Sequence, residues 1–132
     1  MKYLQLFCIL TVLCTACNKD DNEPTPAQNI IGKWTIYNSV LLGQNIPGDG
    51  SCLTFNACSG TCSGTDFRAS DTTYGTITYV LNEDASYLYI TDTSGLGGSY
   101  NGTWDVLELT EDKLRIVGST FFGDLKLEMD KD

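Results

Sequence analysis

The sequence predicts an all-β protein built as an eight-stranded antiparallel up-and-down barrel, with a β-sandwich as the alternative. Three observations support this prediction. Thr, Ser, Gly, Tyr and Val are plentiful, while strong helix formers are sparse. From residue 30 onward, apolar and polar side chains alternate with period two in eight short runs. Turn residues separate the runs, so consecutive strands are expected to pair as hairpins, and closing the sheet on itself would leave no exposed edge.

Length, charge and composition exclude several classes of function. The 132-residue chain is long enough for one domain with a single core. Its net charge is −9, from 8 basic and 17 acidic residues, so it has no electrostatic attraction to nucleic acid. It contains no histidine, which excludes His-based catalytic triads and metal clusters. No activated nucleophile or paired carboxylates stand out, so we expect a non-enzymatic protein without metal or cofactor.

The first element, residues 1–16, has the pattern of a secretory signal peptide. Lys2 gives it a positive start, and residues 3–12 are almost wholly apolar. This apolar segment is shorter than the roughly 20 residues that a membrane-spanning helix needs. A buried N-terminal helix is the alternative, but the acidic, proline-containing stretch that follows could not cover one.

The stretch LCTAC at residues 13–17 resembles the processing site of bacterial lipoproteins, in which a small residue precedes a cysteine that is acylated and becomes the new N-terminus. The resemblance implies that residues 1–16 are removed and that Cys17 carries lipid, palmitate-type chains included. Two or three such chains anchor a protein stably in a membrane. Signal cleavage without lipidation is the alternative.

Residues 17–29 are expected to be a flexible tether. They contain an acidic run followed by Pro24 and Pro26, and their hydrophobicity is low. Acidic runs directly after the lipidated cysteine resemble the export signals of surface-displayed lipoproteins in some Gram-negative bacteria. The resemblance implies anchoring at the outer membrane or cell surface, whereas a plain charged spacer is the alternative.

Residues 30–132 are the predicted barrel domain. In its first strand Trp34, Ile36, Asn38 and Val40 share one face, as period-two alternation requires. Residues 44–50, rich in Gly, Pro and Asp, are expected to form a loop. The eight expected strands lie at residues 31–42, 52–58, 62–69, 74–81, 86–91, 100–109, 113–117 and 122–129.

A family resemblance supports the closed barrel. Gly32-Lys33-Trp34 in the first strand has the Gly-x-Trp form of lipocalins. The series GKWTI, LTFNACSGTCSGT, YGTITYVL, YLYIT, GTWDVLELTEDKLRI and LKLEMDK is similar to small bacterial lipocalin-like lipoproteins and covers the whole domain. The chain is shorter than true lipocalins and lacks an obvious helix after the barrel. The resemblance implies a barrel that binds a small apolar ligand.

Apolar residues on the expected inward faces are candidates for lining a ligand pocket. The alternative is that they only fill the core, because aromatic side chains in small barrels usually occupy the interior. The candidates are Trp34, Ile36, Phe55, Phe67, Tyr79, Leu88 and Trp104.

Three cysteines remain after the expected processing, and an exported protein is expected to form disulfides. Cys58 and Cys62 flank a three-residue turn and would face each other across a hairpin, so we expect them to pair. In that register Cys52 lies opposite Arg68 and stays free. The rival pairings, Cys52 with Cys62 or Cys58, need a bulge. A metal site is not expected, because neither Cys-x-x-Cys spacing nor a histidine ligand is present.

A possible modification site lies between two expected strands. Asp71-Thr72-Thr73 resembles an O-glycosylation acceptor of exported proteins in some Gram-negative bacteria, which makes Thr72 a candidate.

Two functions fit this sequence. The first is a monomeric, membrane-anchored lipoprotein whose lipocalin-like domain binds a small apolar ligand at the cell envelope. The second is a structural or protein-interaction module with a filled barrel, displayed at the cell surface. An interior cavity of about 300 Å³ or more favours the first. A barrel packed solid by Trp34, Phe55 and Trp104 favours the second.

Overall fold

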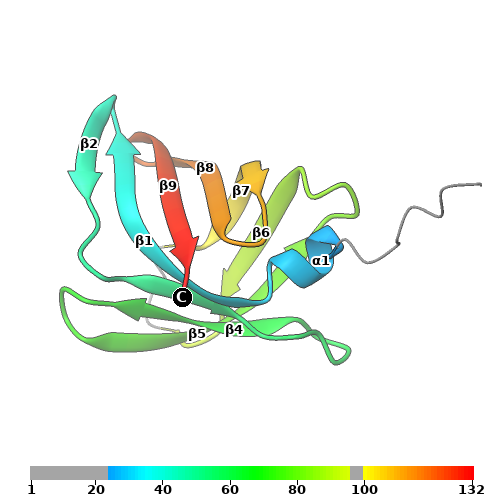
Figure 1. The fold of residues 1–132 in the computed structure, drawn as a ribbon. Coiled ribbons are helices and arrows are strands. Elements are labelled where there is room, and N and C mark those ends of the chain that lie inside the picture. The colour runs from blue at the N-terminus through cyan, green and yellow to red at the C-terminus, as the bar shows by residue number, and fades with distance from the viewer. Residues whose placement is uncertain (1–23, 96–99) are drawn as a thin grey trace, which may run out of the picture.

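The computed structural model describes residues 24–95 and 100–132, and in this part of the chain it is a closed antiparallel β-barrel (Figure 1). Eight strands close the barrel in the order β1-β3-β4-β5-β6-β7-β8-β9, with β9 pairing back to β1. This closure confirms the predicted up-and-down barrel and excludes the sandwich. The elements are α1 (Pro26–Asn29), β1 (Gly32–Leu41), β2 (Gln44–Pro47), β3 (Cys52–Phe55), β4 (Ser63–Arg68), β5 (Thr73–Leu81), β6 (Tyr87–Asp92), β7 (Gly102–Leu109), β8 (Lys113–Thr120) and β9 (Gly123–Lys131).

Each of the eight expected strands corresponds to one barrel strand, but the expected loop at residues 44–50 contains the additional strand β2. Leu42 and Gly43 have φ values of 53° and 75°, which allows a tight two-residue turn between β1 and β2. β2 then pairs with the second half of β1, and β3 pairs with its first half. The prediction missed β2 because its four exposed residues show no apolar alternation.

The crossing between β2 and β3 depends on Gly48. Its backbone N–H donates to the carbonyl of Tyr37 at 2.8 Å. A Cβ at this position would lie 1.9 Å from the carbonyl oxygen of Ile36, so only glycine fits without a shift of the backbone. The crossing segment, residues 48–51, thereby stays close to β1 where β2 ends.

A one-turn helix, α1, lies in the segment that was expected to be a flexible tether. Pro26 is its first residue, and the side chain of Gln28 accepts a hydrogen bond from the backbone N–H of Thr25 at 2.9 Å. Ile30 follows the helix and is buried in the barrel. The rest of the expected tether, residues 17–23, and the expected signal peptide lie outside the described residues.

Two tryptophans stand near opposite ends of the barrel. Trp34 Nε1 donates to the carbonyl of Ile30 at 2.7 Å, and Trp104 Nε1 donates to the carbonyl of Tyr100 at 2.8 Å. Gly102-Thr103-Trp104 repeats the Gly-x-Trp pattern of residues 32–34, and both glycines have positive φ. Because all neighbouring strands are antiparallel, β1 and β7 run in opposite directions and begin at opposite ends. The same local motif therefore holds a tryptophan near each end of the barrel by a hydrogen bond to the carbonyl four residues earlier.

The inward side chains form one apolar core among the described residues. The buried members of the core are Ile30, Trp34, Ile36, Leu53, Phe55, Ile77, Tyr79, Leu88, Ile90, Tyr100, Trp104, Leu114, Ile116, Leu127 and Met129.

Candidate functional site

Six of the seven predicted pocket residues lie inside the barrel. Each of the six is at most 4% exposed, and the rings of Phe55 and Tyr79 pack edge to face with centroids 4.9 Å apart. Trp34, Phe55 and Trp104 therefore occupy much of the interior themselves. The six are Trp34, Ile36, Phe55, Tyr79, Leu88 and Trp104.

Phe67 was expected to point inward, and the structure shows that this was wrong. The β3–β4 register pairs Cys52 with Phe67 and Phe55 with Gly64, one residue away from the expected pairing of Cys52 with Arg68. The shift arises because the β3 side carries one extra residue before the bridge between Ser59 and Thr61. A slip of one residue exchanges the faces of a strand. The ring of Phe67 consequently lies outside the barrel, 4.7 Å from that of Tyr74.

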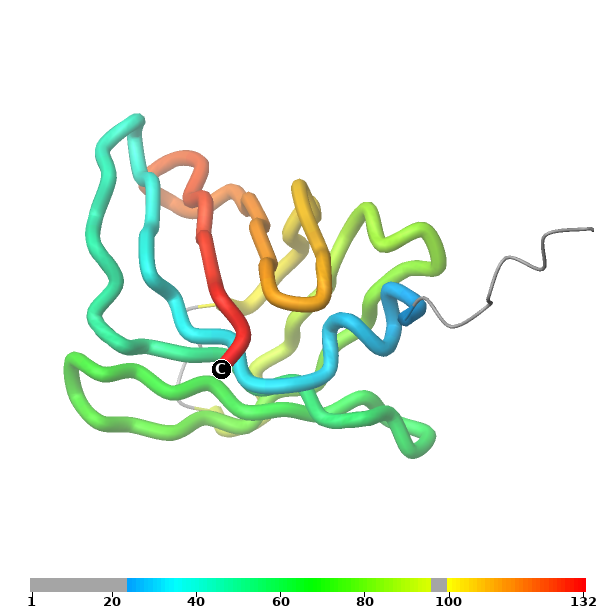
Figure 2. The backbone as a smooth tube through the Cα atoms, in the orientation of Figure 1, coloured from blue at the N-terminus to red at the C-terminus, as the bar shows by residue number. Residues whose placement is uncertain are grey.

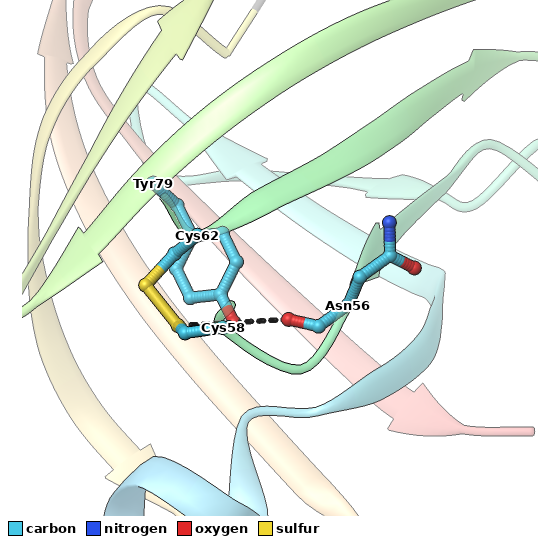
Figure 3. Close-up of a disulfide and its surroundings, with 4 residues drawn as sticks. All are labelled: Asn56, Cys58, Cys62 and Tyr79. Carbon is cyan, nitrogen blue, oxygen red and sulfur yellow. Dashed lines mark hydrogen bonds between the residues drawn. A yellow bond between two sulfur atoms is a disulfide. The ribbon is translucent and has the colours of Figure 1, made fainter. Parts of the chain in front are cut away.

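The predicted disulfide between Cys58 and Cys62 is confirmed, and Cys52 is free and buried. Burial raises the pKa of the Cys52 thiol, which disfavours the reactive thiolate. Figure 3 shows that Tyr79 lies against the disulfide, with its hydroxyl donating to the carbonyl of Asn56 at 2.6 Å. These contacts fix the loop that carries the extra residue.

The barrel end at which β1 begins is closed. The ammonium of Lys131 lies 5.0 Å from the centre of the Trp34 ring and donates to the carbonyl of Asn29 at 2.9 Å. Ile30 fills the space between this helix and the core. Sequence reasoning did not identify Lys131, because the last expected strand ended at residue 129, two residues before it.

At the opposite end, the barrel mouth opens into a pocket of about 280 Å³. We call it the mouth pocket. Its inner wall is apolar, formed by Ile36, Leu125 and Leu127, and its rim is largely polar. The volume is close to the lower end of the range for small-molecule sites, roughly 300–1,000 Å³. The remaining lining residues are Ser39, Ile46, Pro47, Gly48, Asp49, Ser51 and Tyr100.

A bulge in β1 helps to form the mouth pocket. The pairing of β1 with β9 shifts between Ile36 and Asn38, so Ser39 and Leu41 pair with the inward Leu127 and Leu125. Asn38, which was expected to share the face of Trp34, instead pairs with Glu128. The bulge therefore places a small serine at the inner wall, where strict alternation would place Val40.

Tyr100 is the main ionisable group of the mouth pocket. Burial, followed by the negative charges of Asp49 and Asp66, raises the pKa of its hydroxyl to about 12. Asp49 lies at the exposed rim, where hydrogen bonds from Ser51 lower the pKa of its carboxyl. The backbone N–H of Ser51 donates to Asp49 at 2.9 Å.

Asp66 is a second carboxylate whose charge acts on Tyr100, and it is buried. Only 2% of its surface is exposed, and its Oδ1 has no hydrogen-bond partner. Among the described residues, Asp66 and Ser51 are the buried polar ones. The burial of Asp66 was not predicted, because the expected register placed this residue on the outer face.

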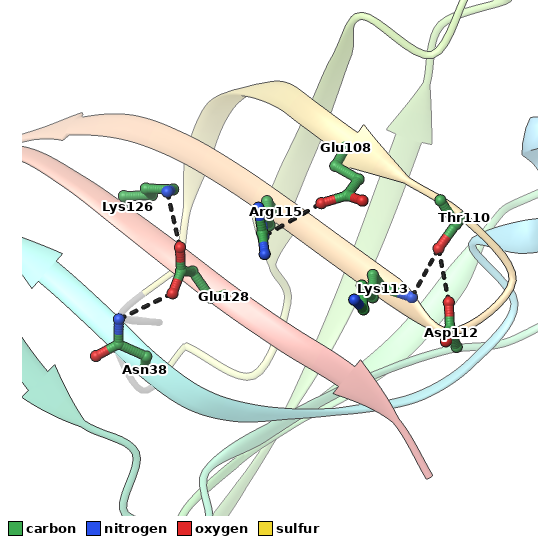
Figure 4. Close-up of polar contacts among 8 residues, drawn as sticks. All are labelled: Asn38, Glu108, Thr110, Asp112, Lys113, Arg115, Lys126 and Glu128. Carbon is green, nitrogen blue, oxygen red and sulfur yellow. Dashed lines mark hydrogen bonds and ion pairs between the residues drawn. The ribbon is translucent and has the colours of Figure 1, made fainter.

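The outer surface of the barrel carries a lattice of polar contacts across β1, β9, β8 and β7 (Figure 4). Glu128 accepts a hydrogen bond from Asn38 at 2.9 Å and pairs with Lys126 at 2.7 Å, and these contacts lower the pKa of its carboxyl. Arg115 lies 3.2 Å from Glu108. Such solvent-facing ion pairs contribute about 0–1 kcal/mol each, so this face is a solvated surface.

Thr72 is exposed in the turn between β4 and β5, and its φ is 54°. Its hydroxyl donates to the carbonyl of Asp71 at 2.8 Å. The position is accessible from solvent, and its glycosylation stays a prediction.

Comparisons with models of known protein families and with characterised proteins found no match to this sequence. Within residues 24–95 and 100–132, no helix has the length and apolar character needed to cross a membrane. In the same residues, no group of three or more Cys, Asp or Glu side chains is arranged to hold a metal ion. The mouth pocket is therefore the candidate functional site of the protein.

Proposed function

We propose that this protein is a lipid-anchored lipoprotein of the outer membrane or cell surface, whose lipocalin-like barrel binds a small, mainly apolar ligand without catalysing a reaction. The observation that carries the proposal is the mouth pocket, whose apolar wall of Ile36, Leu125 and Leu127 is continuous with the core. A small barrel that is closed at one end and open at the other can hold one small ligand at its open end.

The position of α1 is compatible with an N-terminal lipid anchor that leaves the mouth pocket accessible. The segment of α1, blue in Figure 2, lies on the side of the barrel away from the turn between β1 and β2. A tether attached there leaves the mouth pocket on the side away from the anchor. The lipid would thus hold the protein while the mouth stays open to solvent.

Lipidation is tested on the full chain purified from its native membranes. Mass analysis of the N-terminal peptide should show an acylated Cys17 as the first residue. The Cys17→Ser variant should lose both the acyl mass and its partition into the detergent phase. An unacylated native chain, or one that begins at another residue, would contradict the anchor.

A protein-interaction module is the second candidate, and one observation favours it. Leu42, Phe121 and Phe122 are 74%, 97% and 70% exposed. They sit at neighbouring turns, because a Cβ on Gly123 would lie 3.0 Å from the side chain of Leu42 (Figure 2). Exposed apolar groups of this kind mark contact surfaces. If the Phe121→Ser/Phe122→Ser variant loses a co-purifying protein while native chains carry no small molecule, this second function replaces the first.

A further inference from the structure

The outer face of β5, β6 and β7 carries two exposed tyrosines that take no part in the core or the mouth pocket. Tyr87 and Tyr89 alternate along β6 with the buried Leu88 and Ile90, and they are 44% and 45% exposed. Residues two apart on one strand lie about 7 Å from each other and point to the same side. The two rings therefore form a short aromatic row on the outer surface of the barrel.

A groove of about 310 Å³, which we call the outer groove, lies beside this row. Its floor is built from two neighbouring cross-strand pairs of β5 and β6, Val80 with Tyr89 and Thr78 with Thr91. The loop at residues 60–62 forms its wall. An aromatic ring, an apolar side chain and two hydroxyl groups thus lie next to one another on the floor of the outer groove.

The wall of the outer groove is held in place by covalent and hydrogen bonds. The disulfide between Cys58 and Cys62 closes the loop that forms the wall (Figure 3). The carbonyl of Cys62 also accepts a hydrogen bond from the backbone N–H of Tyr79 at 2.9 Å, which ties the wall to β5. A site that is formed in advance loses less conformational entropy when a ligand binds.

The hydroxyl groups on the floor are free to bind a ligand. Within the described part of the chain, those of Thr78, Thr91 and Tyr89 make no hydrogen bond to the protein. Thr93, just beyond β6, differs, because its hydroxyl bonds with that of Thr76 at 3.0 Å. None of the described residues that line the outer groove is charged. The groove therefore fits a neutral ligand that presents both hydroxyl groups and apolar surface.

A second groove, also of about 310 Å³, continues this face on the other side of the tyrosines. Thr103 and Asp105 on β7 line it, and they pair with Tyr89 and Tyr87 of β6. Asp124 is its other acidic lining residue. Carboxylates accept hydrogen bonds from ligand hydroxyls and repel anions. The face can thus hold several units of a hydroxylated chain, and it disfavours a chain that carries negative charge.

We propose that this outer face binds a neutral oligosaccharide, one sugar of which lies in the outer groove against Tyr89, with its hydroxyls bonded to Thr78 and Thr91. A sugar ring combines hydroxyl groups with C–H groups that pack on the negative face of an aromatic ring. The outer groove and the mouth pocket share no lining residue. The inference therefore goes beyond the proposed function and does not depend on it.

The test is an NMR titration of the full chain, in an uncharged detergent, with four neutral hexasaccharides and one acidic hexasaccharide. The neutral probes are maltohexaose, cellohexaose, mannohexaose and chitohexaose, and the acidic probe is hexagalacturonate. Backbone amide signals of Thr78, Tyr89 and Thr91 report whether a probe occupies the outer groove. We expect at least one neutral probe to shift them with a dissociation constant on the order of 1 mM, so that a bound sugar dissociates during purification. Hexagalacturonate should bind at least about tenfold more weakly.

Variants of the tyrosines test the stacking contact. Tyr89→Ala should bind the neutral hexasaccharide about tenfold more weakly, because the ring is lost, whereas Tyr89→Phe keeps the ring and should stay closer to the native chain. Tyr74→Ala is the matched control, because Tyr74 is 70% exposed on β5 and lines neither groove. It should keep the native affinity. The comparison of neutral and acidic probes on the native chain stands even if Tyr89→Ala fails to fold.

Three results would overturn the inference. They are the failure of all four neutral probes to shift the signals of the outer groove, equal binding of neutral and acidic probes, and an unchanged affinity in Tyr89→Ala. The first would leave this face to a protein partner. The two sites are separated by Ser39→Trp, which fills the mouth pocket and should keep the sugar, and by Thr78→Trp, which fills the outer groove and should lose it.

Discussion

Tyr100 places an ionisable group at the mouth end of an otherwise mainly apolar interior, and the negative charge of the buried Asp66 acts on it. Tyrosine becomes charged when it loses its proton, and burial beside two carboxylates opposes that charge. The unperturbed tyrosine pKa, about 10, applies to the unfolded chain. The folded chain therefore holds this proton more tightly than the unfolded chain does.

This difference predicts a loss of stability at high pH. The contribution of Tyr100 is fully present below about pH 10. Between that pH and the folded pKa of about 12, the unfolded chain has released a proton that the folded chain retains. The free energy of unfolding should fall there by up to about 1.4 kcal/mol per pH unit. Urea titrations across this window measure the slope.

The control for this prediction is Tyr100→Phe, which keeps the ring and removes the titrating group. Burial also raises the pKa of Tyr79, but that group is common to both proteins. The variant should show a shallower slope than the native chain above pH 10. Parallel slopes would mean that Tyr100 is not buried as described.

At the scale of elements, the loop between β3 and β4 is held by the disulfide. Cys58 and Cys62 are separated by four positions, and closing so short a loop is worth about 2 kcal/mol in the chain-entropy model. The double variant Cys58→Ser/Cys62→Ser should lower the free energy of unfolding by about that amount, measured by urea titration. Native protein treated with a reductant should match the variant. Equal midpoints for oxidised and reduced protein would show that the disulfide adds no stability.

The strands could be predicted from the sequence, while their exact faces could not. Period two located all eight barrel strands, since each has one buried face. Single-residue irregularities then changed the faces at three places. They are the bulge between Ile36 and Asn38, the extra residue before Cys58, and the register shift between Val106 and Glu108. A bulge leaves no mark in an alternating pattern, because it depends on which residues the partner strand presents.

These irregularities also explain why the mouth pocket was only partly anticipated. Of the seven predicted pocket residues, Ile36 lines it. Trp34 and Trp104 were correctly expected inside, and they pack in the core. The sequence did not predict that Ser51 and Tyr100 line the mouth pocket, because their position there depends on the path of the crossing segment, residues 48–51. The repeated Gly-x-Trp pattern at residues 102–104 was the one available cue to the carbonyl of Tyr100.

For the whole molecule, the two tryptophans make the same bond at opposite ends of the barrel. Trp34→Phe should destabilise the protein by about 1–3 kcal/mol, because the buried carbonyl of Ile30 loses its donor. Phe121→Ala, at the exposed turn between β8 and β9, should change the free energy of unfolding by less than about 0.5 kcal/mol. Thermal unfolding compares the two variants. A Trp34→Phe protein as stable as the native chain would contradict the closed end.

The architecture as a whole is a barrel closed by α1, Trp34 and Lys131 at one end and open beside residues 48–51 at the other. Its interior is largely filled by side chains such as Trp34, Phe55 and Trp104, as expected for a structural or protein-interaction module. Its mouth pocket, at about 280 Å³, lies just below the roughly 300 Å³ at which small-molecule sites begin. The two functions therefore differ in whether the mouth is occupied in the native protein.

The most direct measurement is native mass spectrometry of the chain and two tryptophan variants, each purified from membranes. Ser39→Trp fills the mouth pocket from its wall, whereas Thr78→Trp places the same bulk on the outer face of β5. The native chain and Thr78→Trp should each carry one small molecule, and folded Ser39→Trp should carry none. A native chain without bound small molecule, or one retained equally by Ser39→Trp, would contradict ligand binding at the mouth.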